Sequence, residues 1–572
     1  MLQLNDFLNN LHVYIGGHHW FVFLLLGTGI FFTLYLKFPQ VRYFRHAIKI
    51  VKGKYDKKGD LGDTSHFQAL ATALSGTVGT GNIAGVALAI HLGGPAALFW
   101  MLMTALLGMC TKFVEVTLSH KYREFDKEGM VSGGPMYYMK SRLNIKLNNG
   151  KTIETGYLLG GFFAIAAVLS SFGTGSLPQI NSISNSVYAS FGISHIMTGA
   201  ILAIILALVI IGGIRRIAKV TEKLVPIMAV IYFLGAVAVI LSNYQNFFPS
   251  LIAVFSDVFT GTAAIGGFMG AGLAFAFNNG VNRGLFSNEA GQGSAPIAHA
   301  AARAHEPVSE GMVAILEPFI DTIIICMLTG MTLLSSGVWH EKHYNTFQNT
   351  DIEILSQQYD DNTPENIEKL KSHIAKTEKL PLFTGKLIVS DGKISNDISM
   401  LHARSLAENI EVKKGKEPFS GELSISEGKI RDQSSDITIA GKSLLHSAPL
   451  TNAAFTKSIL GKNGDLVVTI GLLLFAFSTA IAWSYYGDRA ITYLFGVKWV
   501  MPYRILYVVA FFFAAFIDTT IIWNLSMITV AFMTIPNLLG LLILHREVKS
   551  TIRDYWKGFK AEHPDEKSPE QW

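Results

Sequence analysis

The segment "GTVGTGN" (Gly76 to Asn82) places three glycines in the middle of an apolar stretch that runs from Leu74 to Ile90. Glycine weakens a helix, so this pattern predicts a break inside a segment of membrane-spanning length. In hydrocarbon each unpaired backbone N–H or C=O costs several kcal/mol, so such a break needs partners for its polar groups. Freed carbonyls suit a cation, and the N-terminus of the following half-helix suits a carboxylate. The amide of Asn82 could serve either.

A structural role for these glycines remains open, because small residues also let membrane helices pack closely. Gly76, Gly79, Gly81 and Gly85 are spaced well enough for that role alone. A phosphate-binding loop does not fit, because no Lys-Ser or Lys-Thr pair follows the glycines.

A second glycine-rich segment, "AAIGGFMGAGLAFAF" (Ala263 to Phe277), occupies the corresponding place in the second half of the chain. Two interrupted segments at matching positions are the best sequence indication of a transporter binding site. We therefore expect a second broken helix here.

The composition predicts a helical membrane protein with many spans. Of 572 residues, 50% are hydrophobic and only 16% are charged, against about 25% charged in a typical soluble chain. About eleven apolar segments recur, one in front and ten after it, and the ten form a 5+5 inverted repeat if they divide equally. Lys and Arg gather in alternate loops, which puts the amino terminus outside and the carboxyl terminus in the cytoplasm. The formal charge of +5 is spread over loops and does not indicate nucleic acid.

Four segments organise the chain. They are an extra transmembrane helix with a cytoplasmic linker (1–60), helices 1–7 of the core (61–339), an extracytoplasmic insertion (340–458), and helices 8–10 with a cytoplasmic tail (459–572). The insertion repeats itself, since Leu382 to Asp397 resembles Pro418 to Gln433. Alternating apolar and polar residues in each copy predict a pair of β-hairpins, and hence a small β-rich module, although a loose loop remains the alternative.

Longer motifs carry a resemblance to a known family. "GTVGTGN" resembles the unwound first core helix of neurotransmitter:sodium symporters with the leucine-transporter fold. "GTGNIAGVA", "SGGPMYYM", "RGLFSNEAGQGSAP" and "FAFSTAIAWSYYG" are more closely similar to the alanine or glycine:cation symporter family. The resemblance covers nearly the whole chain except the insertion. It implies an all-α fold with broken first and sixth core helices, and sodium-coupled uptake of a small neutral amino acid such as alanine or glycine. It implies no cofactor beyond the coupling sodium ion.

The resemblance also suggests a substrate site. The substrate carboxylate would take backbone N–H groups near Thr80 and Gly81, and Asn82 would contact either end of the zwitterion. Its ammonium would take carbonyls freed around Gly267 and Gly270.

Three side chains would complete this site. Gln179 lies in a polar run that is expensive within a span unless it faces a cavity or partner helices, and the resemblance favours substrate contact over a packing hydrogen bond. Phe268 and Trp483 would wall the pocket and limit the substrate's size, although either could be an ordinary packing aromatic.

For sodium, the resemblance implies the hydroxyls of Ser478 and Thr479 together with carbonyls near Ser75 and Val78. Sodium, like other hard cations, prefers oxygen ligands. The alternative is that both hydroxyls bond back to carbonyls of their own helix, as Ser and Thr often do.

Other classes of function are less well supported. A proton-coupled amino-acid symporter, or a channel or sensor on the same scaffold, remains an alternative. Four acids lie near the membrane, Glu115, Glu289, Glu317 and Asp321, of which one could carry a proton, whereas Glu115 and Glu289 are expected in cytoplasmic salt bridges. No catalytic triad, metal cluster or nucleotide motif is visible, which argues against an enzyme and an ATP-driven pump. The expected location is the cell (inner) membrane, with lipid, sodium and amino acid as partners.

Overall fold

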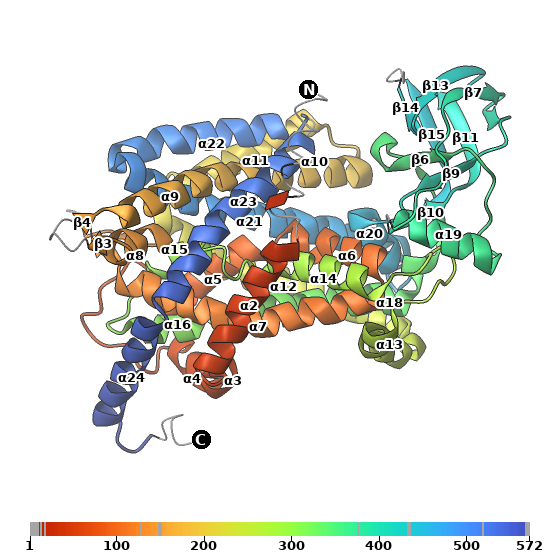
Figure 1. Cartoon of the computed structure of the whole chain (residues 1–572). Helices are drawn as coiled ribbons and strands as arrows, with labels where there is room; N and C mark the ends of the chain where they lie inside the picture. The colour runs from red at the N-terminus through yellow and green to blue at the C-terminus, as the bar shows by residue number, and fades with distance from the viewer. Residues whose placement is uncertain are drawn as a thin grey trace.

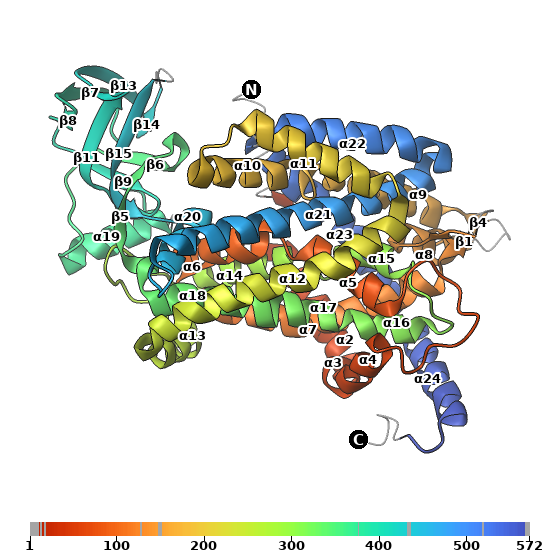
Figure 2. The same ribbon diagram turned by 180° about the vertical axis from the view of Figure 1, so that it is seen from behind.

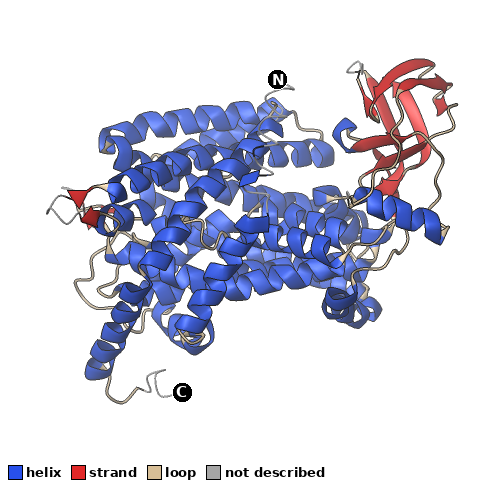
Figure 3. Cartoon of the chain, in the orientation of Figure 1, coloured by secondary structure: helices blue, strands red, loops and turns tan. Residues whose placement is uncertain are grey.

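The computed structural model describes residues 11, 14–15, 19–125, 129–146, 152–375, 377–431, 436–517 and 520–566, with the side chains of 19 and 520–524 left out. Residues 1–10, at the start of the predicted 1–60 segment, lie outside this range. Helices form one body, and most strands gather at one end of it (Figures 1 and 3).

Seven helical runs in the described residues are long and apolar enough to cross a membrane. They are α7 (Pro95–Lys121), α9 with α10 (Thr155–Phe191), α12 (Gly213–Ser242), α16 to α18 (Pro307–Ser336), η6 with α21 (Gly461–Phe495), η7 with α22 (Val497–Ala514), and Leu525–Ile543 of α23. A bent pair, His66–Thr77 with Gly81–Gly93, makes an eighth if it is one span, and Trp20–Tyr35 and His195–Ile210 are shorter apolar helices. The chain is therefore a multi-pass helical membrane protein.

The helix bounds are as follows: α2 His19–Tyr35, α3 Pro39–Arg42, α4 Phe44–Val51, α5 His66–Thr77, α6 Val86–Gly93, α8 Pro135–Arg142, α9 Thr155–Gly173, α10 Leu177–Phe191, α11 His195–Ile210, α13 Phe247–Thr260, α14 Leu273–Asn288, α15 Ala295–His299, α16 Pro307–Ala314, α17 Leu316–Pro318, α18 Met327–Ser336, α19 Pro364–Ile374, α20 Ser447–Thr456, α21 Gly464–Phe495, α22 Val500–Ala514, α23 Thr520–Ile543 and α24 His545–Glu562. The π-helical turns η1 (Gly81–Gly85) and η3 (Phe319–Cys326) interrupt two of the spans.

The break predicted at the first glycine cluster is present. A capping box of Ser65 and Gln68 starts α5, which ends at Thr77, and Val78 takes an extended conformation. The π-helical turn η1 follows and leads into α6, so that the two halves meet at 54°. The carbonyl of Ile83 in this turn accepts a hydrogen bond from Thr451 of α20 at 3.3 Å. A side chain of another helix thus supports the irregular backbone, as the cost of a break in hydrocarbon requires.

The second break lies elsewhere than expected. Residues 261–272 form a non-helical hairpin in which Thr262 pairs with Ala271, and Gly266 and Gly270 take positive φ values of 55° and 86°. Helix α14 begins only at Leu273, so most of this glycine-rich segment precedes the helix and does not interrupt it.

The helix is instead interrupted after Asn288. Glu289, Gly291 and Gly293 take φ values of 53°, 83° and 82° before α15 begins. Positive φ at several nearby residues stops a right-handed helix. The motif "SNEAGQGSAP" therefore supplies the second discontinuity.

Helix α21 runs through the middle of the helical body. It packs against α5, α9, α10 and α12, and the view from behind shows α12 and α21 side by side (Figure 2). Residues from these helices, among them Val78, Met228 and Trp483, share one large apolar cluster. The broken helix is thus held against a continuous one.

The segment between α18 and α20 is rich in strands and has its own apolar cluster, which includes Ile354, Leu387 and Leu423. Both predicted hairpins are present, as β7 with β8 and β13 with β14. The two copies of the repeat pair with each other in antiparallel fashion, and the equivalent residues Leu387 and Leu423 stand opposite one another. Local twofold symmetry between the copies follows from this register.

The strand bounds are β5 Lys342–Thr346, β6 Ile352–Leu355, β7 Gly385–Ser390, β8 Lys393–Ile394, β9 Ser399–His402, β10 Ser405–Leu406, β11 Glu408–Lys414, β12 Glu417–Pro418, β13 Gly421–Ser426, β14 Lys429–Ile430 and β15 Ile437–Leu444. At the other end of the helical body lie the short strands β1 Glu124–Phe125, β2 Val131–Ser132, β3 Ile145–Lys146 and β4 Thr152–Ile153 (Figure 3).

Because this segment has its own apolar cluster, most of it should be removable. Thr346 of β5 pairs directly with Ala440 of β15, so an Asn-Gly turn can replace residues 347–439 and close the ladder. We expect the shortened protein to remain monodisperse and to unfold within about 5 °C of the full chain.

Leu444→Ala is the contrasting variant. Leu444 is 1% exposed and packs in the cluster of Val86 and Phe268, so its truncation should cost about 2–5 kcal/mol. Aggregation of the shortened chain together with a stable Leu444→Ala variant would contradict the conclusion that residues 347–439 fold separately from the cluster that contains Leu444.

Candidate functional site

Helix α21 presents two hydroxyls to the break at the end of α5. The hydroxyl of Thr479 lies 3.3 Å from the carbonyl oxygen of Val78, and that of Ser478 lies 3.4 Å from the carbonyl oxygen of Ser75. The Ser75 hydroxyl also donates to the Ser478 carbonyl at 2.7 Å. The structure thus brings together all four residues of the predicted sodium site.

These oxygens have the chemistry and spacing of a site for a hard cation. Oxygens that bind one ion at about 2.4 Å and subtend a right angle lie about 3.4 Å apart. Both hydroxyls also bond back to Phe475 O within α21, at 2.8 Å for Ser478 and 3.0 Å for Thr479. A hydroxyl that donates its hydrogen to Phe475 O keeps its lone pairs for a cation, so the geometry is compatible both with back-bonding and with the ion role.

Glycine makes this close approach possible. A Cβ at Gly79 would lie 2.6 Å from the Thr479 hydroxyl, and one at Gly76 would lie 2.7 Å from the Tyr486 hydroxyl. A Cβ at Gly85, by contrast, would have no neighbour within 4 Å. A side chain at Gly76 or Gly79 would thus collide with α21, whereas one at Gly85 would meet nothing.

Two amide side chains satisfy the backbone of the break. The side-chain oxygen of Asn82 accepts the Gly79 N–H at 2.8 Å, and that of Gln179 accepts the Thr80 N–H at 3.5 Å. Gln179 also donates to the Thr174 carbonyl at 3.0 Å, which fixes its orientation. Gln179, Thr80 and Asn82 are all buried, so the predicted residues from the break, from η1 and from α10 meet at one point.

Asn82 connects the break to an acid on the span of α16 to α18. Its amide donates to the Asp321 carboxylate at 2.6 Å, and Ser287 of α14 donates to the same carboxylate at 2.8 Å. The third donor to this carboxylate, the Thr322 hydroxyl at 2.6 Å, is also neutral. An ionised carboxylate among neutral donors within a span is costly, so Asp321 is a candidate functional residue. Sequence reasoning listed it only as one of four acids.

Trp483 lies at the second discontinuity. Its indole N–H donates to the Glu289 carboxylate at 3.2 Å, and the side chain is fully buried. Glu289 also accepts the Ser294 hydroxyl at 2.5 Å. A Cβ at Gly175 would lie 2.1 Å from Trp483 Cβ. Trp483 is thus held between the second break and the turn before α10.

The predicted salt bridges of Glu115 and Glu289 are absent from the described residues. Both carboxylates are buried, and Glu115 accepts the Asn537 amide at 2.9 Å. Neutral donors serve both acids.

Phe268, Gly267 and Gly270 do not belong to this site, which corrects their prediction as substrate residues. Phe268 packs on Trp339, with ring centroids 5.1 Å apart, and the Gly267 N–H donates to the His340 carbonyl at 2.7 Å. The physical reason is the helix boundary. Helix α14 begins only after these residues. At 1.5 Å per residue it carries the chain roughly 20 Å before the second break begins after Asn288.

Phe286 is an aromatic beside the break in addition to Tyr486, because its ring would lie 3.7 Å from a Cβ at Gly81. The sequence contained a signal for it, since Phe286 stands in "RGLFSNEAGQGSAP".

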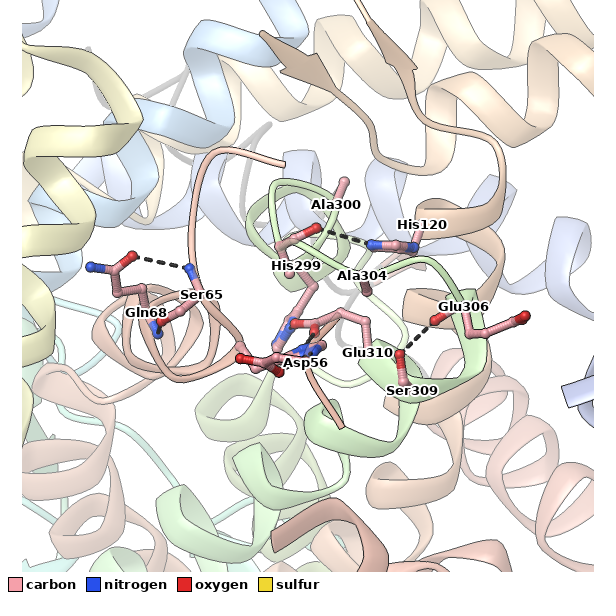
Figure 4. A network of polar contacts seen from close by, with 12 residues as sticks. Asp56, Ser65, Gln68, His120, His299, Ala300, Ala304, Glu306, Ser309 and Glu310 are labelled. Carbon is pink, nitrogen blue, oxygen red and sulfur yellow. Dashed lines mark hydrogen bonds and ion pairs between the residues drawn. The ribbon is translucent and has the colours of Figure 1, made fainter. Parts of the chain in front are cut away.

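A chain of buried charges links the helices at the end opposite the insertion. His299 bridges Glu310, at 2.5 Å, and Glu317, which pairs with Lys112 at 2.9 Å. His66 joins Glu310 from α5 and lies 3.7 Å from Asp56, whose side chain is 53% exposed (Figure 4). The side chains of Lys112, Glu317, His299 and Glu310 are at most 1% exposed. Removing one partner of such a buried pair costs about 3–5 kcal/mol, so this network ties α5, α7, α15 and α16 together.

Comparison with known proteins identifies the family of the chain. The model of the sodium:alanine symporter family matches residues 1–360 and 434–569. The sodium/alanine symporter AgcS of Methanococcus maripaludis is 35% identical over 547 residues, which are 96% of this chain and 96% of that protein. An uncharacterized transporter of Haemophilus influenzae is 33% identical over 543 residues, 95% of this chain and 94% of its own.

Among solved structures the likeness is weak. The manganese transporter of Eremococcus coleocola matches 84% of this chain and 78% of its own at 12% identity and a TM-score of 0.45, too low to assign a fold. The family model and the relatives are decisive, and the chain belongs to the sodium:alanine symporter family, whose members are transporters and not enzymes.

Proposed function

We propose that the protein carries a small neutral amino acid, alanine or glycine, into the cytoplasm together with sodium, by alternating access. One observation carries the proposal: the hydroxyls of Ser478 and Thr479 lie against the carbonyls of Ser75 and Val78, which the helix break has freed. A hard cation there would supply the positive charge that a break rich in carbonyls favours.

The amino acid would bind beside this cation. Its carboxylate would lie at the start of the half-helix formed by η1 and α6, near Thr80 and Gly81, where the helix dipole favours negative charge. Gln179 and the backbone of the second discontinuity would hold the ammonium group. Trp483 and Phe286 would bound the side chain and thus its size.

The rest of the architecture is proposed on the same basis. Residues 61–339 and 459–572 would form a core of 5+5 inverted repeats, with 1–60 as an additional helix and 340–458 as an external module. The amino terminus would be outside and α24 in the cytoplasm, in the inner membrane. In support, α24 and the strands of the insertion lie at opposite ends of the helical body (Figure 1).

Proton coupling is the alternative with a specific observation behind it. The buried chain from Lys112 through Glu317, His299 and Glu310 to His66 consists of groups that can exchange protons. Asp321 beside Asn82 is a further group of this kind. A channel or sensor has no comparable support.

Uptake of labelled alanine by proteoliposomes tests the proposal. With sodium outside and none inside, alanine should accumulate above its external concentration. Because the substrate is a zwitterion, each sodium ion moves one charge, and 100 mV should contribute about 2.3 kcal/mol. Accumulation driven by an imposed pH gradient without sodium would instead favour the proton-coupled alternative.

Thr479→Val in the same assay tests the assignment of the cation site. The substitution keeps the shape and removes one oxygen, so the sodium concentration for half-maximal uptake should rise about tenfold or more. The alanine dependence at saturating sodium should change less. Unaltered sodium dependence in this variant and in Ser478→Ala would remove both hydroxyls from the site.

A matched pair of glycine variants tests whether the break itself is the site. Gly79→Ala forces a methyl group against the Thr479 hydroxyl, whereas Gly85→Ala meets nothing within 4 Å. Overpacking costs about 1–3 kcal/mol, so Gly79→Ala should lower uptake about tenfold or more at limiting sodium, while Gly85→Ala stays within about twofold of the parent. Equal effects of the two would mean that only helix propensity matters at this position.

A further inference from the structure

A cavity of about 600 Å³ lies between the insertion and the outer end of the broken helix. Leu88, His91 and Leu92 of α6 line one side, and residues of the insertion, among them Asp351, Lys379 and Arg404, line the other. Its volume is within the range of small-molecule sites. Along η1 and α6 the partly exposed residues Gly81, Ala84, Gly85, Leu88 and Leu92 recur on one side, so one stripe of this half-helix leads from the break to the cavity.

The guanidinium of Arg404 is a cationic group in the lining of this cavity, and its Nε–H has no hydrogen-bond acceptor among the described residues. The guanidinium lies over the ring of Phe275 at 4.4 Å, and Nε is buried with no hydrogen-bond partner. Burial lowers the pKa of Arg404 to about 10, so the group remains charged at neutral pH. Stacking occupies the face of the guanidinium and leaves its edge, which can bind a carboxylate through two parallel hydrogen bonds.

The backbone that carries Arg404 is strained. Ala403 and Arg404 connect β9 to β10 as a two-residue turn, with φ values of 47° and 59°. Such a turn normally uses Asn-Gly or another glycine pair, because L-residues avoid positive φ. This hairpin tip thus carries an arginine where local conformation favours glycine.

The other charges of the cavity are mostly paired. Asp351 bonds to His446 at 3.1 Å, Glu353 to His373 at 3.2 Å, and Lys429 donates to the Ile352 carbonyl at 2.6 Å. Lys379 at the rim is exposed. On the floor, Nδ1 of His91 is buried without a partner, in a side chain only 2% exposed. The cavity therefore offers a carboxylate the cationic groups of Arg404 and Lys379, and Asp351 and Glu353 in the same lining would attract an ammonium group.

We propose that this cavity is a second binding site for an amino acid, held by its carboxylate on Arg404, at the outer entrance of the pathway to the broken helix. The cationic side chains of the cavity favour a carboxylate. That this carboxylate belongs to an amino acid rests on the proposed function. Residues 361–433, which include Arg404 and Lys379, fall outside the match to the family model, so the site is an addition to the shared transporter core.

Binding of L-alanine to the full-length purified protein in sodium-free buffer distinguishes this site from the one proposed at the broken helix, where binding would require sodium. Ligand-observed saturation-transfer NMR detects weak binding and gives a dissociation constant by titration. We expect L-alanine to bind without sodium and alaninol, which lacks the carboxylate, not to bind. Arg404→Gln should raise the dissociation constant about tenfold or more, and Arg404→Lys by less, because lysine retains the charge but not the paired geometry.

Two controls keep the test decisive. Lys386→Gln removes a charge from the same insertion, where Lys386 is 71% exposed and pairs with Glu422 away from the cavity, and should leave binding unchanged. Thr479→Val should raise the sodium concentration that the sodium-dependent component needs and leave the sodium-free component unchanged. Absence of sodium-free binding in the parent, or binding equal to the parent in a folded Arg404→Gln variant, would overturn the second site. If the parent binds L-alanine equally with and without sodium, the second site stands and the result counts against the proposed function.

Discussion

The structure depends on one constraint: the backbone polar groups at residues 78–82 are buried within a span and must have partners. Several kcal/mol per unpaired group is more than a marginally stable protein can leave uncompensated. The partners come from elsewhere in the chain. Asn82 and Gln179 accept N–H groups of the break, and Thr479 donates to the Val78 carbonyl. The break therefore fixes where α10 and α21 must lie.

The same constraint explains the neighbouring glycines and charges. Gly79 and Gly175 allow α21 to approach closely, and the network centred on His299 holds α5 to α15 and α16. We interpret this network as a set of contacts that keeps α5, the first half of the broken helix, fixed to its neighbours. A cation between α5 and α21 would then couple two groups of helices, which is the arrangement that alternating access between repeats requires.

Local sequence predicted the first break and the two hairpins of the insertion, whereas the grouping of Thr479 with Val78 came from the family resemblance. It was wrong about Phe268, Gly267 and Gly270, because glycine density alone does not distinguish a hairpin outside the helix from a break within it. The second break follows from positive φ at Glu289, Gly291 and Gly293, and Glu289 gives no compositional signal. Asp321 could not be placed beside Asn82 from sequence, since 239 residues separate them and only tertiary packing joins them.

Direct binding of radioactive sodium to the purified protein in detergent tests the central claim without relying on transport. The account predicts saturable sodium binding by the parent that alanine strengthens, because the carboxylate and the cation would share the break. It predicts that the double variant Ser478→Ala/Thr479→Val loses this binding while its unfolding temperature stays within about 5 °C of the parent. Sodium binding of equal affinity in the folded double variant would contradict the account.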